Sequence, residues 1–329
     1  MNDLTRKLRD IVTDLFGKGS IDLFIGYEQG SLPGTTTPCF IRSKDQVDRL
    51  IWDSFCSNNL AVYLPRYFLP PSQGKEKTFP KIGIAVKGCD GRNLVVICNE
   101  NQVPRANITI VGLACSGIID NDKLQNSIKG TEVVEAKEET TKICVVDDEG
   151  TKTELAKESL LADSCLACED SLSPIADIVV GEKIDNDFIK STVIEEFEGS
   201  NIETRWNHFE QEMAKCIRCY ACRQACPLCY CRECFAEQTN PRWMGTGSAL
   251  SELMMFHLGR MIHTTGRCVD CGACARACPM GVDLRTFQRK LVEVVENQFG
   301  YKPGMTMDEI APLATFTLAD KEEFITKPK

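Results

Sequence analysis

Two four-cysteine runs of identical spacing constrain this chain more than any other feature of its sequence. Both have the pattern C-x2-C-x2-C-x3-C-P, so that the last cysteine of each run is followed directly by a proline. The cysteines of the first run are Cys216, Cys219, Cys222 and Cys226. Those of the second run are Cys268, Cys271, Cys274 and Cys278. The spacing predicts a tight turn on which three thiolates converge, while the fourth cysteine lies a helical turn further on and points away.

This is the run with which bacterial two-cluster ferredoxins bind [4Fe-4S] clusters, and in those proteins the fourth cysteine ligates the other cluster. We therefore expect two clusters with crossed ligands. The expected ligands of cluster 1 are Cys216, Cys219, Cys222 and Cys278. Those of cluster 2 are Cys268, Cys271, Cys274 and Cys226. Structural zinc is the alternative, but zinc usually takes two cysteine pairs separated by a longer loop, which matches two four-cysteine runs poorly.

Composition narrows the class of protein further. The chain has 329 residues, of which 43% are hydrophobic, and this is enough to form more than one domain. Its 19 cysteines are too regularly spaced, in too long a chain, for a secreted disulfide scaffold. We find no apolar signal core and no stretch as long as a membrane span, so we expect a cytoplasmic protein. The net charge of −9 argues against nucleic acid as a partner.

Residues 81–117 have the pattern of a parallel α/β unit. Runs rich in β-branched residues at 81–86 and 108–113 enclose a stretch with helical character at 92–102. Asp90 is a candidate cap for that helix. A strand, a helix and a second strand in this order predict a βαβ crossover and a parallel sheet.

A third set of cysteines follows the predicted strands. Cys89 and Cys115 each come just after a strand, at the carboxyl end, where open α/β sheets place their binding sites. A C-x2-C pair, Cys165 and Cys168, comes later in the chain. We expect these four thiols to hold a third [4Fe-4S] cluster. The alternative is that Cys89 and Cys115 are small buried residues and that the pair binds zinc or forms a redox dithiol.

Other N-terminal segments give simpler predictions. Apolar residues at helical spacing predict an amphipathic helix over 4–16, and a second helix is expected over 45–56. The short apolar run at 61–64 is a strand candidate. Residues 131–156 read as a short antiparallel addition to the α/β domain.

The segment between the two cysteine runs, residues 227–267, is longer than a minimal ferredoxin needs. It predicts a helix capped by Ser248, and a further helix is expected to follow the second run from Asp283. The clusters are therefore expected in helical packing. We interpret His257 and His263 as satisfied helix-face side chains and not as ligands, because the two runs already supply the thiolates.

Three surplus cysteines, Cys229, Cys231 and Cys234, come directly after the first run. Two interpretations stay open for them: part of an additional metal site with a fourth ligand from elsewhere, or packing beside cluster 1. Overall we expect an α/β domain with a parallel sheet at 1–200, a mainly helical two-cluster ferredoxin-like domain at 201–300, and a C-terminal docking tail at 301–329.

Several motifs resemble one family. They are Lys87-Gly88-Cys89-Asp90, the run Val111 to Gly117, and Cys165 to Asp170 with its continuation Ala176 to Gly181. These motifs resemble the beta subunits of hydrogenases and formate dehydrogenases that reduce a deazaflavin, coenzyme factor 420. The resemblance covers residues 20–190 approximately. It implies a domain that carries a [4Fe-4S] cluster and an FAD, where the FAD exchanges hydride with the deazaflavin. The double-cluster region is similar to that of formate-dehydrogenase-type beta subunits and of the helical ferredoxin subunit of heterodisulfide reductases.

The sequence departs from this family at the flavin site. The glycine-rich, threonine-containing helix start that accompanies FAD has no clear counterpart, and residues 30–37 are the nearest stretch. We therefore expect an electron-transfer subunit of an oxidoreductase complex of the formate dehydrogenase, hydrogenase or heterodisulfide-reductase type. It would pass single electrons between a catalytic subunit and a flavin-containing partner, without catalytic residues of its own. The alternatives are an FAD-containing subunit that itself reduces or oxidises a deazaflavin, and a zinc-dependent interaction module.

Overall fold

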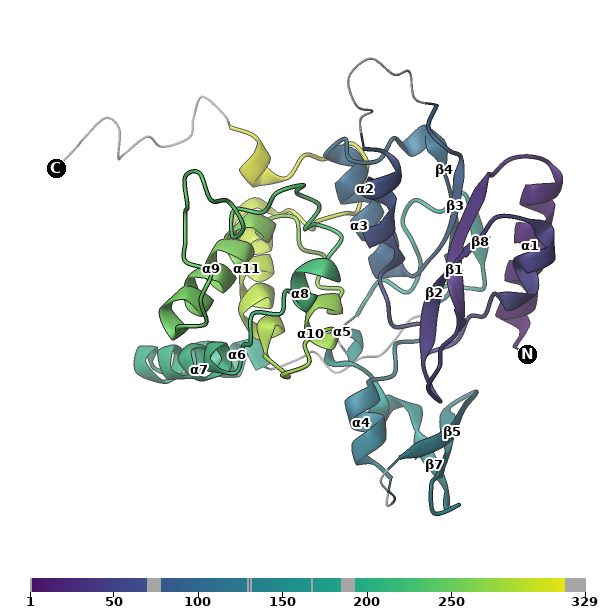
Figure 1. Ribbon diagram of the computed structural model, residues 1–329, viewed down its shortest axis with the longest axis horizontal. Helices are drawn as coiled ribbons and strands as arrows, with labels where there is room; N and C mark the ends of the chain where they lie inside the picture. Colours follow the sequence, from purple (N-terminus) through teal and green to yellow (C-terminus); the bar gives the residue numbers. More distant parts are fainter. Residues whose placement is uncertain are drawn as a thin grey trace.

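The computed structural model describes residues 2–69, 78–128, 130, 132–166, 168–184 and 193–316. Its N-terminal part contains the sheets and its C-terminal part is helical, and the two lie side by side (Figure 1). The boundaries at 200 and 300 stay a prediction. None of the described helices is long and apolar enough to cross a lipid bilayer.

The N-terminal part is built on a mixed five-stranded sheet with the order β2-β1-β3-β4-β8. Its strands are β1 (Leu23–Gln29), β2 (Thr36–Ile41), β3 (Ile82–Val86), β4 (Ile108–Leu113) and β8 (Ile178–Val180). Strands β1, β3, β4 and β8 are parallel to one another, and β2 pairs antiparallel with β1 at the edge. All residues of β3 are buried because helices cover both faces of the sheet.

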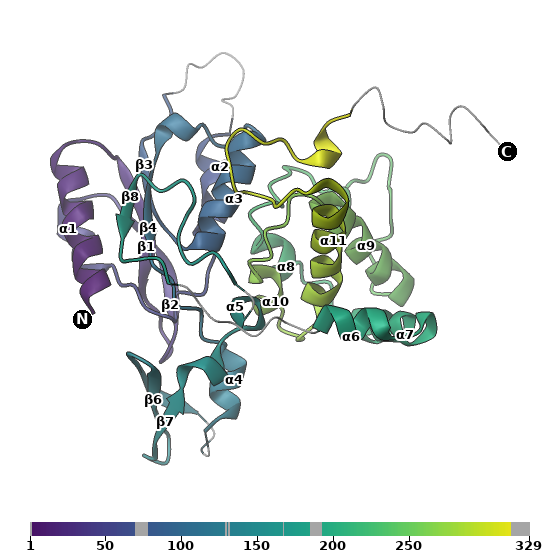
Figure 2. The ribbon, with the colours of Figure 1, turned by 180° about the vertical axis from the view of Figure 1, so that it is seen from behind.

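Helix α1 (Asp3–Gly17) covers one face of this sheet and α3 (Gly88–Asn99) covers the other (Figures 1 and 2). Helix α1 confirms the helix predicted over 4–16, and it buries Leu8, Val12 and Leu15 against the sheet. The predicted βαβ unit is confirmed by β3, α3 and β4. Its helix begins earlier than predicted, and Asp90 is not the cap but the third helical residue, whose carboxylate accepts from the Lys87 backbone N–H at 3.3 Å.

Two local predictions are wrong. The segment 45–56 forms a short 3-10 helix, η1 (Lys44–Arg49), and then irregular chain, because the Asp53 carboxylate accepts from the Phe55 backbone N–H and competes with helical bonding. The segment 61–64 is not a strand but the 3-10 helix η2 (Leu60–Tyr63) leading into α2 (Leu64–Tyr67). A short buried apolar run fits either type of element.

The predicted antiparallel addition is confirmed as a three-stranded sheet. It consists of β5 (Val133–Glu139), β6 (Lys142–Asp147) and β7 (Lys152–Ala156) in this order. It packs with α4 (Asn121–Asn126) around its own apolar cluster, which contains Leu124, Ile143 and Val145. The remaining short elements here are η3 (Arg105–Asn107), η4 (Lys157–Leu160) and α5 (Asp163–Leu166).

The C-terminal part consists of helices around the two cysteine runs, as predicted. Its helices are α6 (Val193–Gly199), α7 (Ile202–Ala214), α8 (Ala221–Gln224), α9 (Leu250–Thr264), α10 (Ala273–Arg276), α11 (Leu284–Phe299) and the 3-10 helix η5 (Pro312–Ala314). The helix predicted between the runs is α9, but it is preceded by Ala249 as cap residue and not by Ser248. The helix predicted from Asp283 is confirmed as α11, and Asp283 is its cap residue, whose carboxylate accepts from the Thr286 backbone N–H at 3.1 Å.

The two parts meet along α3. Leu228 and Val269, which follow or belong to the cysteine runs, are buried in the same apolar core as the sheet. Arg92 of α3 donates to the Pro303 carbonyl at 2.8 Å and to the Val269 carbonyl at 3.4 Å. The first part of the predicted tail therefore lies on α3, while residues 317–329 of that tail are outside the described residues.

Three candidate cluster sites and an adjacent cavity

The two cysteine runs adopt the same backbone turn. Arg218 and Asp270 occupy equivalent positions and have φ of 55° and 56°, and Tyr220 and Gly272 have φ of 61° and 68°. These left-handed conformations are uncommon for residues other than glycine. The identical spacing of the runs thus gives two copies of one loop, each followed by a short helix, α8 or α10.

The thiols predicted for cluster 1 line a single small cavity. They are Cys216, Cys219, Cys222 and Cys278, and the last of them comes from the second run. Burial raises the pKa of the Cys222 thiol to about 11, whereas Cys219 is exposed to solvent. The Cys216 sulfur accepts from the Arg218 backbone N–H at 3.3 Å, and the Cys278 sulfur from the Val282 backbone N–H at 3.4 Å.

The thiols predicted for cluster 2 line another cavity. They are Cys226, Cys268, Cys271 and Cys274. Cys226 comes from the first run and the other three from the second. Burial raises the pKa of Cys271 to about 11 and that of Cys268 well above its ordinary value. Such thiols are protonated unless a metal replaces the proton, so these are sites where metal binding and loss of a proton are coupled.

The third predicted set also meets in the structure. Cys89 lies in the first turn of α3, Cys115 in the loop after β4, and Cys165 and Cys168 in and after α5; all four line a cavity of about 640 Å³. Burial raises the pKa of Cys115 to about 12. The Ile118 backbone N–H donates to the Cys165 sulfur at 3.3 Å.

The three sites lie in a row. Cys271 lines both the third cavity and the cavity of cluster 2, and it lies close enough to Cys89 to raise the pKa of that buried thiol electrostatically. Across the other junction, Cys274 of cluster 2 acts in the same way on Cys222 of cluster 1. The order is therefore third site, cluster 2, cluster 1, with the exposed Cys219 at the far end.

The residues present fit [4Fe-4S] clusters. Each cavity offers four cysteine sulfurs, and backbone N–H groups donate to sulfurs of cluster 1 and of the third site, which is the donor set that such clusters use. Among the residues that the structure describes, no three His, Cys, Asp or Glu side chains converge closely enough to hold a single metal ion.

The surplus cysteines have different surroundings. Cys229 is half-buried beside Cys226, whose side chain bonds to it and lowers the pKa of Cys229. Cys231 is exposed, and Cys234 packs at the edge of the apolar cluster formed by α7 and α9. An additional metal site on these residues stays a prediction.

His257 makes a contact that the sequence did not predict. It lies on α9 and is 1% exposed, and its Nε2 is 3.3 Å from the Cys216 sulfur. Its place on a helix is as predicted, but among the described residues its Nδ1 has no hydrogen-bond partner, so only Nε2 is satisfied. That His257 is not a ligand stays a prediction. Burial, helped by Arg260 and Arg218, lowers the pKa of His257 to about 4. Its spacing of four from the buried Leu253 and Met261 was the available signal, whereas His263 lies on the exposed face of the same helix.

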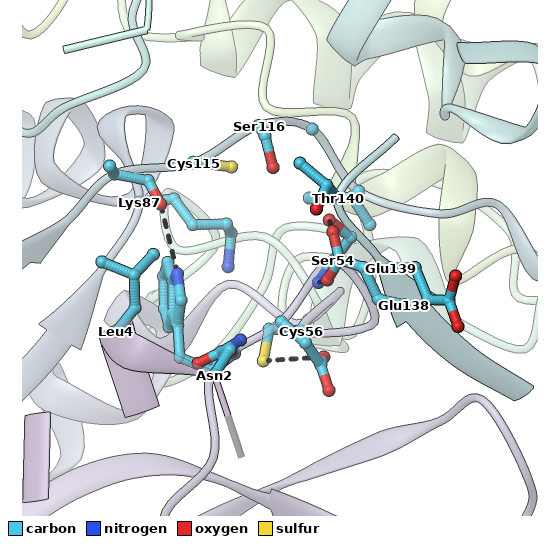
Figure 3. A pocket seen from close by; sticks show the side chains of 15 residues that line it. Asn2, Leu4, Ser54, Cys56, Lys87, Cys115, Ser116, Glu138, Glu139 and Thr140 are labelled. Carbon is cyan, nitrogen blue, oxygen red and sulfur yellow. Dashed lines mark hydrogen bonds between the residues drawn. The ribbon is translucent and has the colours of Figure 1, made fainter. Parts of the chain in front are cut away.

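A further cavity, of about 560 Å³, lies next to the third site, and Figure 3 shows its side chains. Lys87 and Cys115 line both cavities. The Lys87 ammonium is fully buried and is bonded to the Tyr27 hydroxyl, to the Asn58 carbonyl at 2.8 Å and to the Asp90 carboxylate at 2.9 Å.

Carboxylates dominate the rest of this cavity. Asp53, Glu138 and Glu139 line it, and burial raises the pKa of Asp53. Glu138 accepts from the Ser54 hydroxyl at 2.7 Å and from the Lys157 ammonium at 2.5 Å. Burial opposes the ionisation of Glu138, but Lys157 and Ser54 outweigh it and hold the pKa of this carboxyl below its ordinary value.

The cavity does not fit the pyrophosphate of FAD. Among its described lining residues Lys87 is the only cation, and its donors are already used. At the start of α3, where α/β folds bind phosphate, a Cβ added to Gly88 would lie 1.8 Å from the Asp170 carbonyl oxygen, so another segment fills that space. Residues 30–37, the nearest sequence counterpart of the flavin motif, form the turn between β1 and β2 and the first two residues of β2, and not a helix start.

The chain is similar in sequence to several known proteins. A family model described as "4Fe-4S dicluster domain" matches residues 212–282. The "F420-dependent formate dehydrogenase 1 subunit beta" of Methanococcus maripaludis is 24% identical, over 91% of this chain and 90% of that protein. The corresponding subunit beta of Methanocaldococcus jannaschii is 21% identical, over 88% of this chain and 89% of that protein.

A solved chain of the F420-reducing [NiFe] hydrogenase complex from Methanosarcina barkeri is 19% identical, with a TM-score of 0.39. That match covers 53% of this chain and 65% of the solved chain, just under two thirds of its length. By the two sequence comparisons, the chain is similar along nearly its whole length to the beta subunits of F420-dependent formate dehydrogenases, and its helical part matches a 4Fe-4S dicluster domain.

Proposed function

We propose that this chain is the iron–sulfur electron-transfer subunit of a cytoplasmic oxidoreductase complex of the formate dehydrogenase, hydrogenase or heterodisulfide-reductase type. The observation that carries the proposal is the row of three thiol sets, in which Cys271 lines two cavities and Cys274 packs against the apolar cluster that contains Cys222. Nearly full-length similarity to subunits named as parts of formate dehydrogenases supports the type of complex.

Each [4Fe-4S] cluster, when bound, takes up and releases one electron at a time. The chain's own residues would hold the clusters, exclude water from them and supply hydrogen bonds to their sulfurs. Cluster 1 would be held by Cys216, Cys219, Cys222 and Cys278. Cluster 2 would be held by Cys226, Cys268, Cys271 and Cys274. The third would be held by Cys89, Cys115, Cys165 and Cys168.

The two ends of the row differ in exposure, and this suggests where partners bind. At one end Cys219 is exposed, beside Ile217, which is 57% exposed. At the other end Cys115 lies between the third cavity and the neighbouring one. We propose that a partner subunit exchanges electrons at each end, one of them catalytic and one containing flavin. We propose that the flavin belongs to the partner, and the scarcity of cations in the lining of the neighbouring cavity supports this.

The test is the cofactor content of full-length protein purified without oxygen. Iron, acid-labile sulfide, zinc and flavin are measured in the same sample, and the iron is examined by Mössbauer spectroscopy. We expect three [4Fe-4S] clusters per chain and no stoichiometric flavin. One FAD per chain would instead support the alternative of a subunit that itself reduces or oxidises a deazaflavin. Zinc with little iron would overturn both and favour an interaction module.

A further inference from the structure

Helix α9 occupies the long segment between the two cysteine runs and directs two polar side chains inward. His257 and Arg260 are 1% and 6% exposed and lie one turn apart on the same helix. Buried polar side chains on a helix that a minimal ferredoxin lacks need a reason, because burial without full hydrogen bonding costs stability.

We propose that His257 donates a hydrogen bond from Nε2 to the Cys216 sulfur and thereby raises the reduction potential of cluster 1 above the value that the thiolates alone would give. The proposal rests on the proposed function, since it requires a cluster on Cys216. Hydrogen bonds to ligand sulfurs stabilise the reduced, more negatively charged cluster and are one of the means by which proteins set its potential.

The direction of the bond follows from the chemistry of the two atoms. A cysteine sulfur bound to iron carries no proton and can only accept, so at 3.3 Å the bond exists only if Nε2 carries the hydrogen. Among the described residues nothing bonds to Nδ1, so no competing partner fixes the opposite tautomer. The ring of Phe256 packs edge-on against the imidazole at a centroid distance of 4.9 Å and helps to hold its orientation.

This contact distinguishes cluster 1 from cluster 2. Arg260 lies near thiols of both sets: it donates to the Cys222 carbonyl at 3.3 Å, and Cys274 and Cys226 raise its pKa. Its charge therefore acts on both clusters. His257 lines only the cavity of cluster 1, which is also the site with the exposed Cys219. An electron in the row is thereby favoured at the outer cluster.

The experiment is a redox titration of the anaerobic holoprotein, followed by EPR, on three variants. His257→Leu removes the donor, His257→Gln keeps an N–H group of similar reach, and His263→Leu is the matched control on the exposed face of the same helix. In His257→Leu we expect the equilibrium constant for reducing one cluster to fall about tenfold, which is about 59 mV for a one-electron couple. His257→Gln restores part of this shift, and His263→Leu leaves all potentials unchanged.

A second measurement tests whether a nitrogen of His257 interacts with the cluster. Pulsed EPR of the reduced wild-type protein, with histidine labelled with ¹⁵N, shows a nitrogen coupling that His257→Leu loses and His263→Leu keeps. Unchanged potentials in His257→Leu, or no histidine coupling in the wild type, would overturn the proposal. So would loss of one cluster in both His257 variants, because His257 would then be a ligand or an assembly requirement. Absence of cubane iron from the wild type would instead refute the proposed function.

Discussion

The two ferredoxin-type sites and the third site are built in different ways. In the two ferredoxin-type sites, all eight predicted ligands come from two short runs whose backbone turns are copies of each other. In the third site, the ligands come from α3, from the loop after β4 and from the α5 region, and only the sheet brings them together. Local spacing thus specifies one kind of site, and tertiary structure specifies the other. The two kinds should respond differently to changes in the sheet domain.

The largest expected effect is the loss of one cluster when a single predicted ligand is replaced. Cys115→Ser should remove the third cluster and leave the other two, because its thiol lines only the third cavity and the neighbouring one. The matched control is Cys98→Ser, which changes a buried thiol of α3 outside all three cavities. Iron and sulfide per chain, with EPR spin counting, check this. If Cys115→Ser retained three clusters, the third site would be wrong.

The second largest effect is expected from replacing Arg92, which contacts both the third site and the second cysteine run. Arg92 is 7% exposed and bonds to the Asp170 carboxylate at 2.9 Å beside the third site. It also bonds to the Val269 carbonyl inside the second run. Arg92→Ala should lower the free energy of unfolding by roughly 3–5 kcal/mol, because it breaks a buried ion pair. It should also weaken the magnetic coupling between the third cluster and cluster 2.

Denaturant unfolding and EPR line shape of the reduced protein measure these two consequences. Arg92→Lys keeps the charge without the guanidinium fork and should fall between the wild type and Arg92→Ala. Equal stability and unchanged coupling in Arg92→Ala would mean that other contacts set the separation of the two sites.

A smaller effect is expected from a single methyl group at the start of α3. In Gly88→Ala the new Cβ meets the Asp170 carbonyl oxygen, so the segment that carries Cys168 must shift. We expect a cost of about 1–3 kcal/mol, typical of overpacking, and an altered EPR signal of the third cluster only. Gly199→Ala is the control, because nothing lies within 4 Å of its added Cβ. An altered EPR signal from clusters 1 and 2 would contradict the expectation that this change affects the third site alone.

The smallest effect concerns the wall of the cavity next to the third site. The pKa of Glu138 is lowered in the folded protein, so this carboxylate stabilises the fold above the ordinary glutamate range. The contribution is lost as the pH falls from about 4.3 through the folded value. Its size should be on the order of 1 kcal/mol. Urea unfolding at several pH values checks this, and Glu138→Gln should remove that part of the pH dependence.

The parts of the molecule that sequence predicted best are those that local pattern determines. The spacing of the runs predicted which thiols share a cavity, including the crossing of Cys226 and Cys278. The βαβ pattern placed Cys89 and Cys115 at neighbouring strand ends, where parallel strands meet at one edge of the sheet. Whether iron occupies these cavities stays a prediction.

What the sequence did not predict depends on partners far away in the chain. Residues 45–56 have the composition of a helix, but Ser54 is held by Glu138 of the small sheet, and such a bond leaves no local signal. His257 likewise becomes significant only because α9 packs against the first run. The blocked start of α3 depends on the chain around Asp170, far along the sequence.

The segment of residues 301–309 has a consequence for the row of clusters. It runs back from α11 over α3, where the Pro303 carbonyl accepts from Arg92 and the Glu309 carbonyl accepts from Asn99 at 2.9 Å. Separating the helical part from the sheet would break these two hydrogen bonds. If clusters occupy the second and third sites, the gap that an electron would tunnel across between them is therefore held in part by a stretch of chain that contains no cysteine.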